Sequence, residues 1–303
     1  MTNSTDADNL YDYRPIVDRE PIRWPGDARV AFYVALNVEH FEIDRPSTSI
    51  WEGTATLVPD PLNYGWRDYG ARVGFWRLIE TFDRHGVRLS VPLSADVGAH
   101  YPQIIEAGNA RDWTWLAHGK NNSWLHADMA EHDERAFLAD VVDTIERATG
   151  RRPGGWLGPG LTETFNTPKL LAELGLSYVL DWTNDDQPYP LNVPGMLSVP
   201  YTVELNDLGL FLARGMTGPE VLQLIKDQLD QLYADAAHSG RVMALALHPF
   251  VIGQAFRTKY LDQALDYVTN HPGVWVTTSD EIAEHYGRTT GLLSPPGIGI
   301  ARR

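Results

Sequence analysis

Short runs of apolar residues recur along this chain and alternate with longer segments of helical periodicity. Residues 29–37 are apolar at nearly every position, and so are residues 242–247. A strand that lies in a parallel sheet with both faces covered has this continuous pattern, whereas the apolar positions of an amphipathic helix follow its turns. The sequence therefore predicts buried parallel strands that are connected by helices.

About eight strands and about seven helices are expected from these patterns. The strands lie at 29–37, 87–93, 113–117, 155–157, 178–181, 196–199, 242–247 and 274–277. The helices lie at 69–85, 102–107, 132–149, 167–174, 218–237, 260–269 and 279–286. This alternation predicts one α/β domain over residues 1–303, with a lead-in at 1–23 and a loose tail at 288–303. A closed or nearly closed (β/α) barrel and a doubly wound open sheet share this local pattern.

A long segment without clear periodicity, residues 40–68, follows the first strand. It contains Trp51, Tyr64 and Trp66 between prolines and glycines. Long ordered loops in compact domains often have a function, such as covering a binding site. We expect this loop to line or close a pocket, and a subunit contact is the alternative.

The charge and composition of the chain restrict its partners. Forty acidic residues against 25 basic ones give a net charge of -15, which disfavours binding to nucleic acid or to anionic membranes. The absence of cysteine excludes disulfides and thiolate chemistry, so any metal must be held by His, carboxylate or amide groups. With no secretory signal and no apolar run of membrane-spanning length, we expect a cytoplasmic enzyme with a small-molecule substrate.

Polar side chains follow most of the predicted strands, at the end where barrel enzymes carry their active sites. They are Asn37, Glu39 and His40 after the first strand, Ser94 and Asp96 after the second, His118 and Asn122 after the third, Gly158 and Glu163 after the fourth, Asp181, Asp185 and Asp186 after the fifth, and His248 after the seventh. These positions are the candidates for catalysis and binding.

His118 is the first candidate, because the buried run 113–117 leads directly to it. Asn122 follows four positions later, and Glu39 is available from the neighbouring strand. A carboxylate, an imidazole and an amide can hold a divalent cation that keeps open positions for water. The alternative is a histidine that is hydrogen-bonded within a polar barrel mouth.

His248 ends a strongly apolar strand, which would desolvate and position its imidazole for general acid or base catalysis. A structural histidine at a buried strand end is the alternative. Asp185 and Asp186 form an acidic pair before Pro188, and we take Asp186 as a catalytic candidate and Asp185 as a substrate contact. Asp and Asn beside proline also form ordinary turns.

Several familiar catalytic patterns are missing from the chain. It contains no Gly-x-Gly-x-x-Gly, phosphate-binding loop or Gly-x-Ser-x-Gly motif. The nucleophile is therefore expected to be water that a carboxylate or a metal activates.

Six short segments, taken in order, carry a family resemblance. They are Trp24-Pro25-Gly26, Leu36-Asn37-Val38-Glu39, residues 69–78, His118-Gly119, Gly155-Trp156 and Asp185-Asp186-Gln187-Pro188-Tyr189. Over about residues 24–286 the chain resembles the polysaccharide deacetylase superfamily, and within it the cofactor-independent allantoinase and cyclic-imidase branch.

The resemblance implies a distorted (β/α) barrel of seven or eight strands that hydrolyses a carbon–nitrogen bond other than a peptide bond. One carboxylate activates water in such enzymes, a role that falls to Glu39 here, and a late histidine protonates the leaving group, as His248 would. The resemblance also implies a homo-oligomer.

This chain departs from the metal-dependent members of the superfamily. Those members hold a divalent ion through an acid of the first motif and two histidines spaced by four, whereas Asn122 stands four positions after His118. Either zinc or a similar ion is bound through Glu39 or His40 together with His118 and Asn122, or the site works without a metal. The arginine of the sugar deacetylases' third motif is absent from residues 156–159, which argues against a polysaccharide substrate.

The leading prediction is a hydrolase of a small amide, imide or ureide, with cyclic compounds included. Substrate contacts are expected from Asn37, His40, Asp96, Trp156, Asp185 and Trp66. The alternatives are an N-deacetylase of an acylated amino sugar or small molecule, and a non-catalytic barrel that binds a ligand.

Overall fold

Strand β1 (Val30–Leu36) lies at the centre of the computed structural model, which describes residues 10–293. The strand is buried at every position. Its even-numbered side chains, such as Phe32 and Val34, pack in the core between the sheet and the helices. Its odd-numbered side chains, such as Tyr33 and Ala35, pack in a second core inside the curled sheet. Because side chains alternate along a strand, both cores come from one apolar run.

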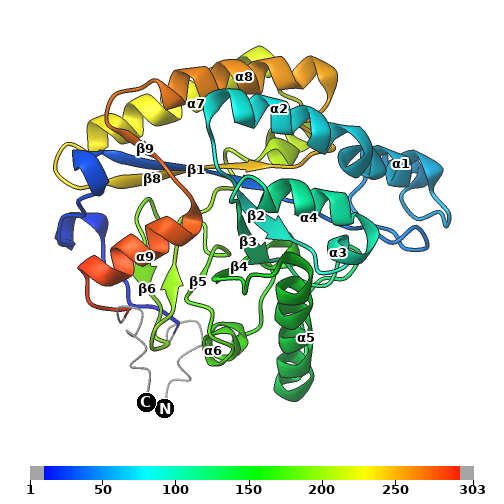
Figure 1. Cartoon of the computed structure of the whole chain (residues 1–303), viewed down its shortest axis with the longest axis horizontal. Helices are drawn as coiled ribbons and strands as arrows, with labels where there is room; N and C mark the ends of the chain where they lie inside the picture. The colour runs from blue at the N-terminus through cyan, green and yellow to red at the C-terminus, as the bar shows by residue number, and fades with distance from the viewer. Residues whose placement is uncertain (1–9, 294–303) are drawn as a thin grey trace.

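The sheet has the strand order β6-β7-β5-β4-β3-β2-β1-β8, and β9 pairs with the first half of β1 (Figure 1). The other strands are β2 (Ser90–Leu93), β3 (Thr114–Ala117), β4 (Gly155–Trp156), β5 (Tyr178–Val179), β6 (Tyr189–Pro190), β7 (Leu197–Ser198), β8 (Arg241–Leu247) and β9 (Val274–Val276). Every paired neighbour is parallel except β6 with β7. The predicted distorted barrel is therefore confirmed as a curled, incomplete barrel, and the open doubly wound sheet is wrong.

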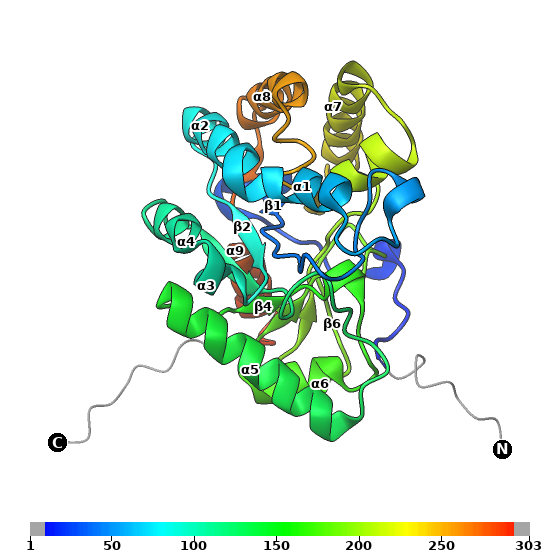
Figure 2. The ribbon, with the colours of Figure 1, turned by 90° about the vertical axis from the view of Figure 1, so that its right-hand side faces the viewer.

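The helices lie around the outside of this sheet, as α2, α4, α5, α7 and α8 show in Figure 2. They are α1 (Pro61–Tyr69), α2 (Phe75–His85), α3 (Val97–His100), α4 (Pro102–Asn109), α5 (Glu131–Thr149), α6 (Thr167–Glu173), α7 (Gly218–Asp235), α8 (Ala255–Thr269) and α9 (Ser279–Thr289). Two π-helical segments, Gly70–Gly74 and Leu208–Ala213, complete the helical elements that bear on the site. Within residues 10–293, no helix combines the length and the apolar character that a membrane span requires.

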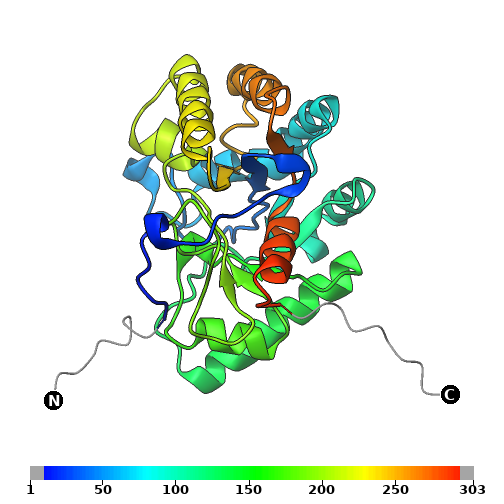
Figure 3. The same ribbon diagram turned by 90° about the vertical axis from the view of Figure 1, so that its left-hand side faces the viewer.

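The two ends of the sheet are joined by irregular segments. The Val242 amide donates to the Asp186 carbonyl at 2.8 Å, and the Ala246 amide donates to the Leu205 carbonyl at 3.1 Å. The N-terminal segment and α9 lie together on one face of the molecule (Figure 3). These hydrogen bonds place the segments after β5 and after β7 against β8, although no regular strand closes the barrel there.

Three predicted elements differ from the structure. Helix α1 occupies part of the segment 40–68, which was expected to be a loop; Asp60 caps this helix and Pro61 starts it, but few apolar positions mark it in the sequence. The antiparallel strand β6 lies in a stretch that was expected to be irregular. Helix α9 continues to Thr289, into the tail expected at 288–303; residues 294–303, like 1–9 of the lead-in, lie outside the described residues.

A close contact between Gly74 and the segment after β8 predicts a stability difference. A Cβ atom on Gly74 would lie 2.1 Å from the Pro249 carbonyl oxygen, whereas one on Gly65 of α1 would have no neighbour within 4 Å. Gly74→Ala should lower the free energy of unfolding by about 1–3 kcal/mol, because backbone must move to relieve the overlap. Gly65→Ala, the control, should leave it unchanged or raise it by up to about 1 kcal/mol. Urea unfolding measures both values, and equal stability of the two variants would contradict this packing.

Candidate active site

The carboxylate of Glu39 lies between two imidazole rings at the mouth of the barrel. Its Oε1 atom is 3.4 Å from His118 Nε2 and 3.8 Å from His248 Nε2. All three side chains are nearly buried, with 6%, 3% and 5% of their surfaces exposed. Glu39 continues the inward-facing positions of β1, and the two histidines follow β3 and β8. The structure thus brings together the three residues that the sequence singled out for chemistry.

The orientation of His118 depends on the next strand of the sheet. Its Nδ1 donates to the Leu157 carbonyl at 2.6 Å, which leaves Nε2 facing Glu39. The following amide, that of Gly158, donates to Asp181 Oδ1 at 2.7 Å. One peptide group therefore connects His118 to the buried carboxyl of Asp181, and this contact holds the ring in place.

A second buried carboxyl, Glu163, lies beside Asp181. Burial raises the pKa of Glu163 to about 7, and burial together with the neighbouring charge of Glu163 raises the pKa of Asp181. When two carboxyl groups are adjacent and removed from water, a state in which they share one proton has a lower free energy than a state with two negative charges. The hydrogen bond from the Gly158 amide joins this pair to the peptide that also holds His118.

Asn122 completes the contacts of Glu39. Its Nδ2 donates to Glu39 Oε1 at 2.5 Å, and its Oδ1 accepts from the Ser94 hydroxyl at 2.9 Å. The amide oxygen, which is the atom a metal would need, is already used by Ser94. Within the described part of the chain, no three His, Cys, Asp or Glu side chains form a metal-binding group. The donor set therefore fits a hydrogen-bonded carboxylate better than a three-ligand divalent metal site.

His248 is held by a buried carboxylate, Asp207. The His248 Nδ1 donates to Asp207 Oδ1 at 2.7 Å, while Asp207 Oδ2 accepts from the His248 amide at 2.8 Å. Burial alone would lower the pKa of His248, but the negative charges of Asp207 and Glu39 outweigh it and raise that pKa above 6.5. The imidazolium is thus favoured, and its Nε2 proton faces Glu39.

Asn37 and Asp96, which the sequence predicts as substrate contacts, are hydrogen-bonded to other groups of the protein near the site. Asn37 donates through Nδ2 to the Tyr201 hydroxyl at 3.1 Å and to the Leu247 carbonyl at 3.2 Å. Asp96 accepts from Asn121 at 2.8 Å and so holds the loop that carries His118 and Asn122. The predicted substrate contacts of Asn37 and Asp96 would therefore compete with bonds inside the protein.

Aromatic rings form one wall near His248. Phe250 lies with its ring centroid 5.6 Å from that of His248, and Trp66 of α1 packs edge-on against Phe250 at 4.8 Å. This arrangement places Trp66 close to the mouth, as its predicted role in substrate binding requires. Its contact with a substrate stays a prediction.

Two other predicted substrate contacts, His40 and Trp156, point away from the mouth. The ring of His40 stacks on His100 with centroids 4.0 Å apart, and Trp156 is fully buried edge-on against His126. His40 directly follows Glu39, and Trp156 directly precedes Leu157, so each faces the side opposite to its neighbour. The structure does not bring them to Glu39, and their substrate contacts stay predictions.

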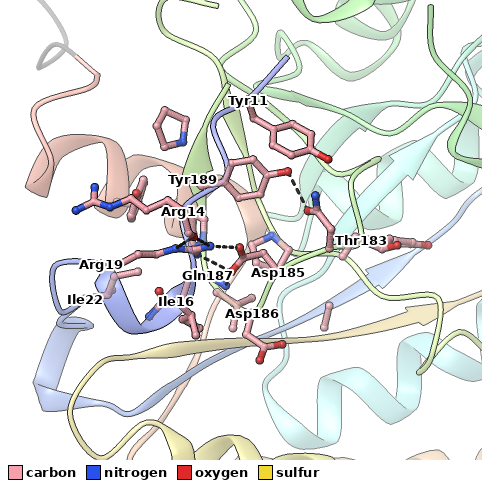
Figure 4. Close-up of a pocket in the computed structure, with 18 of the residues that line it drawn as sticks. Tyr11, Arg14, Ile16, Arg19, Ile22, Thr183, Asp185, Asp186, Gln187 and Tyr189 are labelled. Atoms are coloured by element: carbon pink, nitrogen blue, oxygen red, sulfur yellow. Dashed lines mark hydrogen bonds and ion pairs between the residues drawn. The ribbon is translucent and has the colours of Figure 1, made fainter. Parts of the chain in front are cut away.

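Asp185 and Asp186 also lie elsewhere. Figure 4 shows Asp185 directed at Arg19, which donates to both of its oxygens at 2.7 and 2.5 Å, in a cavity of about 1220 Å³. The Asp186 carbonyl accepts from Val242, which lies six residues before His248, or about 20 Å along an extended strand. Because the chain leaves the mouth after β5, the structure places both residues away from Glu39, and the catalytic role of Asp186 and the substrate role of Asp185 stay predictions.

Sequence reasoning missed two charged residues that the fold brings to the site, Asp207 and Arg67. Asp207 precedes a π-helical segment rather than following a strand, and no local pattern distinguishes it. Arg67 lies in α1, which was hidden in the segment expected to be a loop. Only its place beside Trp66 in a candidate pocket segment pointed to it.

Comparison with known proteins places this geometry in a family. No protein-family model matches the sequence. The Puue allantoinase structure is 28% identical, covers 92% of this chain and 99% of its own, and has a TM-score of 0.81. A structure from Pseudomonas aeruginosa PAO1, described as a probable polysaccharide deacetylase, is 28% identical over 89% of this chain and 95% of its own, with a TM-score of 0.80.

A sequence relative agrees with these structures. A Schizosaccharomyces pombe protein with a provisional polysaccharide deacetylase name is 26% identical over 88% of this chain and 92% of its own length. These relatives support a similarity to the polysaccharide deacetylase superfamily over nearly the whole chain. The family predicted from the sequence is confirmed, as is the enzyme class, a hydrolase that acts on carbon–nitrogen bonds other than peptide bonds.

The Asp207–His248 pair predicts a pH-dependent stability. Because the pKa of His248 is higher in the folded chain than its ordinary value of 6.5, its stabilising effect is complete below about pH 6.5 and is lost as the pH rises through the folded-state pKa. Asp207→Asn should lower the His248 pKa and should destabilise the protein more at acidic than at alkaline pH. NMR titration of the imidazole and urea unfolding at several pH values measure the two effects. The exposed Asp227→Asn serves as control, and an unchanged His248 pKa in Asp207→Asn would refute the pairing.

Proposed function

We propose that this protein hydrolyses a small amide, imide or ureide, either linear or cyclic. The observation that carries the proposal is the position of Glu39 between His118 and a His248 whose other nitrogen is bonded to buried Asp207. A carboxylate that can accept a proton beside an imidazolium that can donate one is the pair that hydrolysis of a carbon–nitrogen bond needs.

The reaction can be written with these groups alone. Glu39 accepts a proton from water, and the water oxygen forms a bond to the carbonyl carbon. His248 donates its Nε2 proton to the leaving nitrogen as the carbon–nitrogen bond breaks. The raised pKa of His248 supports the donor role, because a larger fraction of the ring carries the proton near neutral pH.

A small ureide or imide is preferred because of two observations. The structure of Puue allantoinase, named for a ureide hydrolase, matches this chain over nearly its whole length. The side chains around Glu39 are nearly buried, and Trp66 and Phe250 form an aromatic wall, which suits a compact substrate better than a polymer.

The second candidate is removal of an acetyl group from an acylated amino sugar or small molecule. It is favoured by the deacetylase names of the Pseudomonas aeruginosa and Schizosaccharomyces pombe relatives. The two candidates differ in their products. Deacetylation releases acetate, whereas hydrolysis of a cyclic substrate opens the ring and gives a single product.

Substitution of the two proposed catalytic residues tests the function. Purified protein is assayed with allantoin, hydantoins, succinimides and N-acetylated sugars. Glu39→Gln and His248→Ala should each reduce kcat by about 10²–10⁴-fold, because each removes a proton-transfer group. His132→Ala is the control, since that side chain is 94% exposed. Full activity in both catalytic variants would refute the mechanism, and ligand-induced thermal stabilisation without any turnover would favour a non-catalytic barrel.

Metal removal gives an independent expectation. Because Asn122 offers its amide oxygen to Ser94 and its nitrogen to Glu39, dialysis against a chelator should leave most of the activity, and metal analysis should find less than one ion per chain. Asn122→His, which creates two histidines spaced by four, should bind zinc more tightly in calorimetry. Loss of activity on chelation that zinc restores in the unchanged protein would instead assign a metal to Glu39, His118 and Asn122.

A further inference from the structure

Arg67 is a buried arginine whose hydrogen-bonding groups are mostly unused. Only 5% of the residue is exposed. Its Nη1 donates to the Thr48 carbonyl at 2.5 Å, and its Nε is buried without a partner in the described structure. A guanidinium carries five N–H donors, and a buried donor without an acceptor loses its hydrogen bonds to water without replacement. The free donors therefore favour an oxygen acceptor that the described chain does not provide.

The surroundings of Arg67 connect it to Glu39. A cavity of about 10 Å³ is lined by both residues, together with Tyr101, Pro249 and Phe250. A space of that size holds about one water molecule, or one oxygen atom of a ligand. An oxygen atom in this cavity would lie beside Glu39, the proposed base. It would also lie against Pro249 and Phe250, which directly follow His248.

Packing restricts the guanidinium to this position. It lies over the face of Phe41, 4.9 Å from the ring centroid, and its bond to Thr48 holds one end. Burial lowers the pKa of Arg67, while the negative charges of Asp60 and Glu39 oppose that effect. Since an arginine side chain keeps its charge in proteins, a fixed positive charge stands next to the reaction centre.

We propose that Arg67 binds the acyl oxygen of the substrate and stabilises the negative charge that forms on it during water attack. This inference rests on the proposed function. When the water oxygen bonds to the carbonyl carbon, the electron pair of the C=O double bond moves to the acyl oxygen, where Arg67 donates hydrogen bonds to it. The pair returns as the carbon–nitrogen bond breaks, with the water proton on Glu39 and the His248 proton on the leaving nitrogen. Arg67 is thereby the electrophilic group that stabilises the acyl oxygen. The side chains of this site are poorly suited to supply three ligands to a metal ion that could take that role.

The first experiment compares Arg67→Ala with Arg72→Ala, whose side chain lies on the adjacent helical turn and is 73% exposed. On a substrate that the unchanged protein hydrolyses, Arg67→Ala should reduce kcat by about 10²–10³-fold with a smaller change in KM, and Arg72→Ala should not. Millimolar guanidinium chloride should restore part of the kcat of Arg67→Ala. An undiminished kcat overturns the inference, and so does a loss that added guanidinium leaves unchanged in a variant that remains folded by circular dichroism.

The second experiment separates this inference from the proposed function, because it needs no turnover. Acetate serves as the probe for an acyl oxygen, in protein that carries Glu39→Gln so that the neighbouring carboxylate does not repel it. Calorimetry should show acetate binding that weakens at least about tenfold when Arg67→Ala is added. Equal acetate affinity with and without Arg67 overturns the inference, even if the hydrolase activity is confirmed. Arg67-dependent acetate binding supports it, even if no amide of the panel is hydrolysed.

Discussion

The pairing of β1 with β8 is the interaction on which the site depends. The two strands run parallel and in register from Val30 with Arg241 to Leu36 with Leu247. Because side chains alternate along both strands, the register places the inward positions of both on the same side. Asn37 and Glu39 then leave β1 beside His248, which leaves β8. A shift by one residue would turn Glu39 and His248 to opposite sides, so this register is a condition for the chemistry.

The polar groups around Glu39 are arranged before any substrate binds. Asp207 holds His248 through two hydrogen bonds, and the Leu157 carbonyl holds His118 through one. Such groups are costly to bury unless each has a partner, and most of them do. Preorganised charges need little rearrangement during a reaction, which is how a site of this kind lowers a barrier. Arg67 differs from them because its buried Nε has no partner in the described structure.

The sequence pattern predicted one site that contains both Glu39 and the Asp185–Asp186 pair, but the incomplete barrel separates them. The segment after β5 runs along the seam of the sheet and brings Asp186 to the beginning of β8, far from its end at His248. Asp185 there forms an ion pair with Arg19 of the N-terminal segment. The large cavity of Figure 4 therefore belongs to the seam, while Glu39 and His248 lie at the opposite end of β8. Its size does not make it the reaction site.

Local patterns of residues were enough to predict the alternation of strands and helices, the barrel, and the meeting of Glu39, His118 and His248. These features follow from local patterns, since buried strands are continuous apolar runs and parallel strands end at one edge. Tertiary contacts bring Asp207 and Arg67 to the site, hold Asp185 and Asp186 away from it, and turn Trp156 toward the outer core. Those outcomes depend on barrel closure and on helix packing between segments far apart in the chain, for which no local pattern of residues exists.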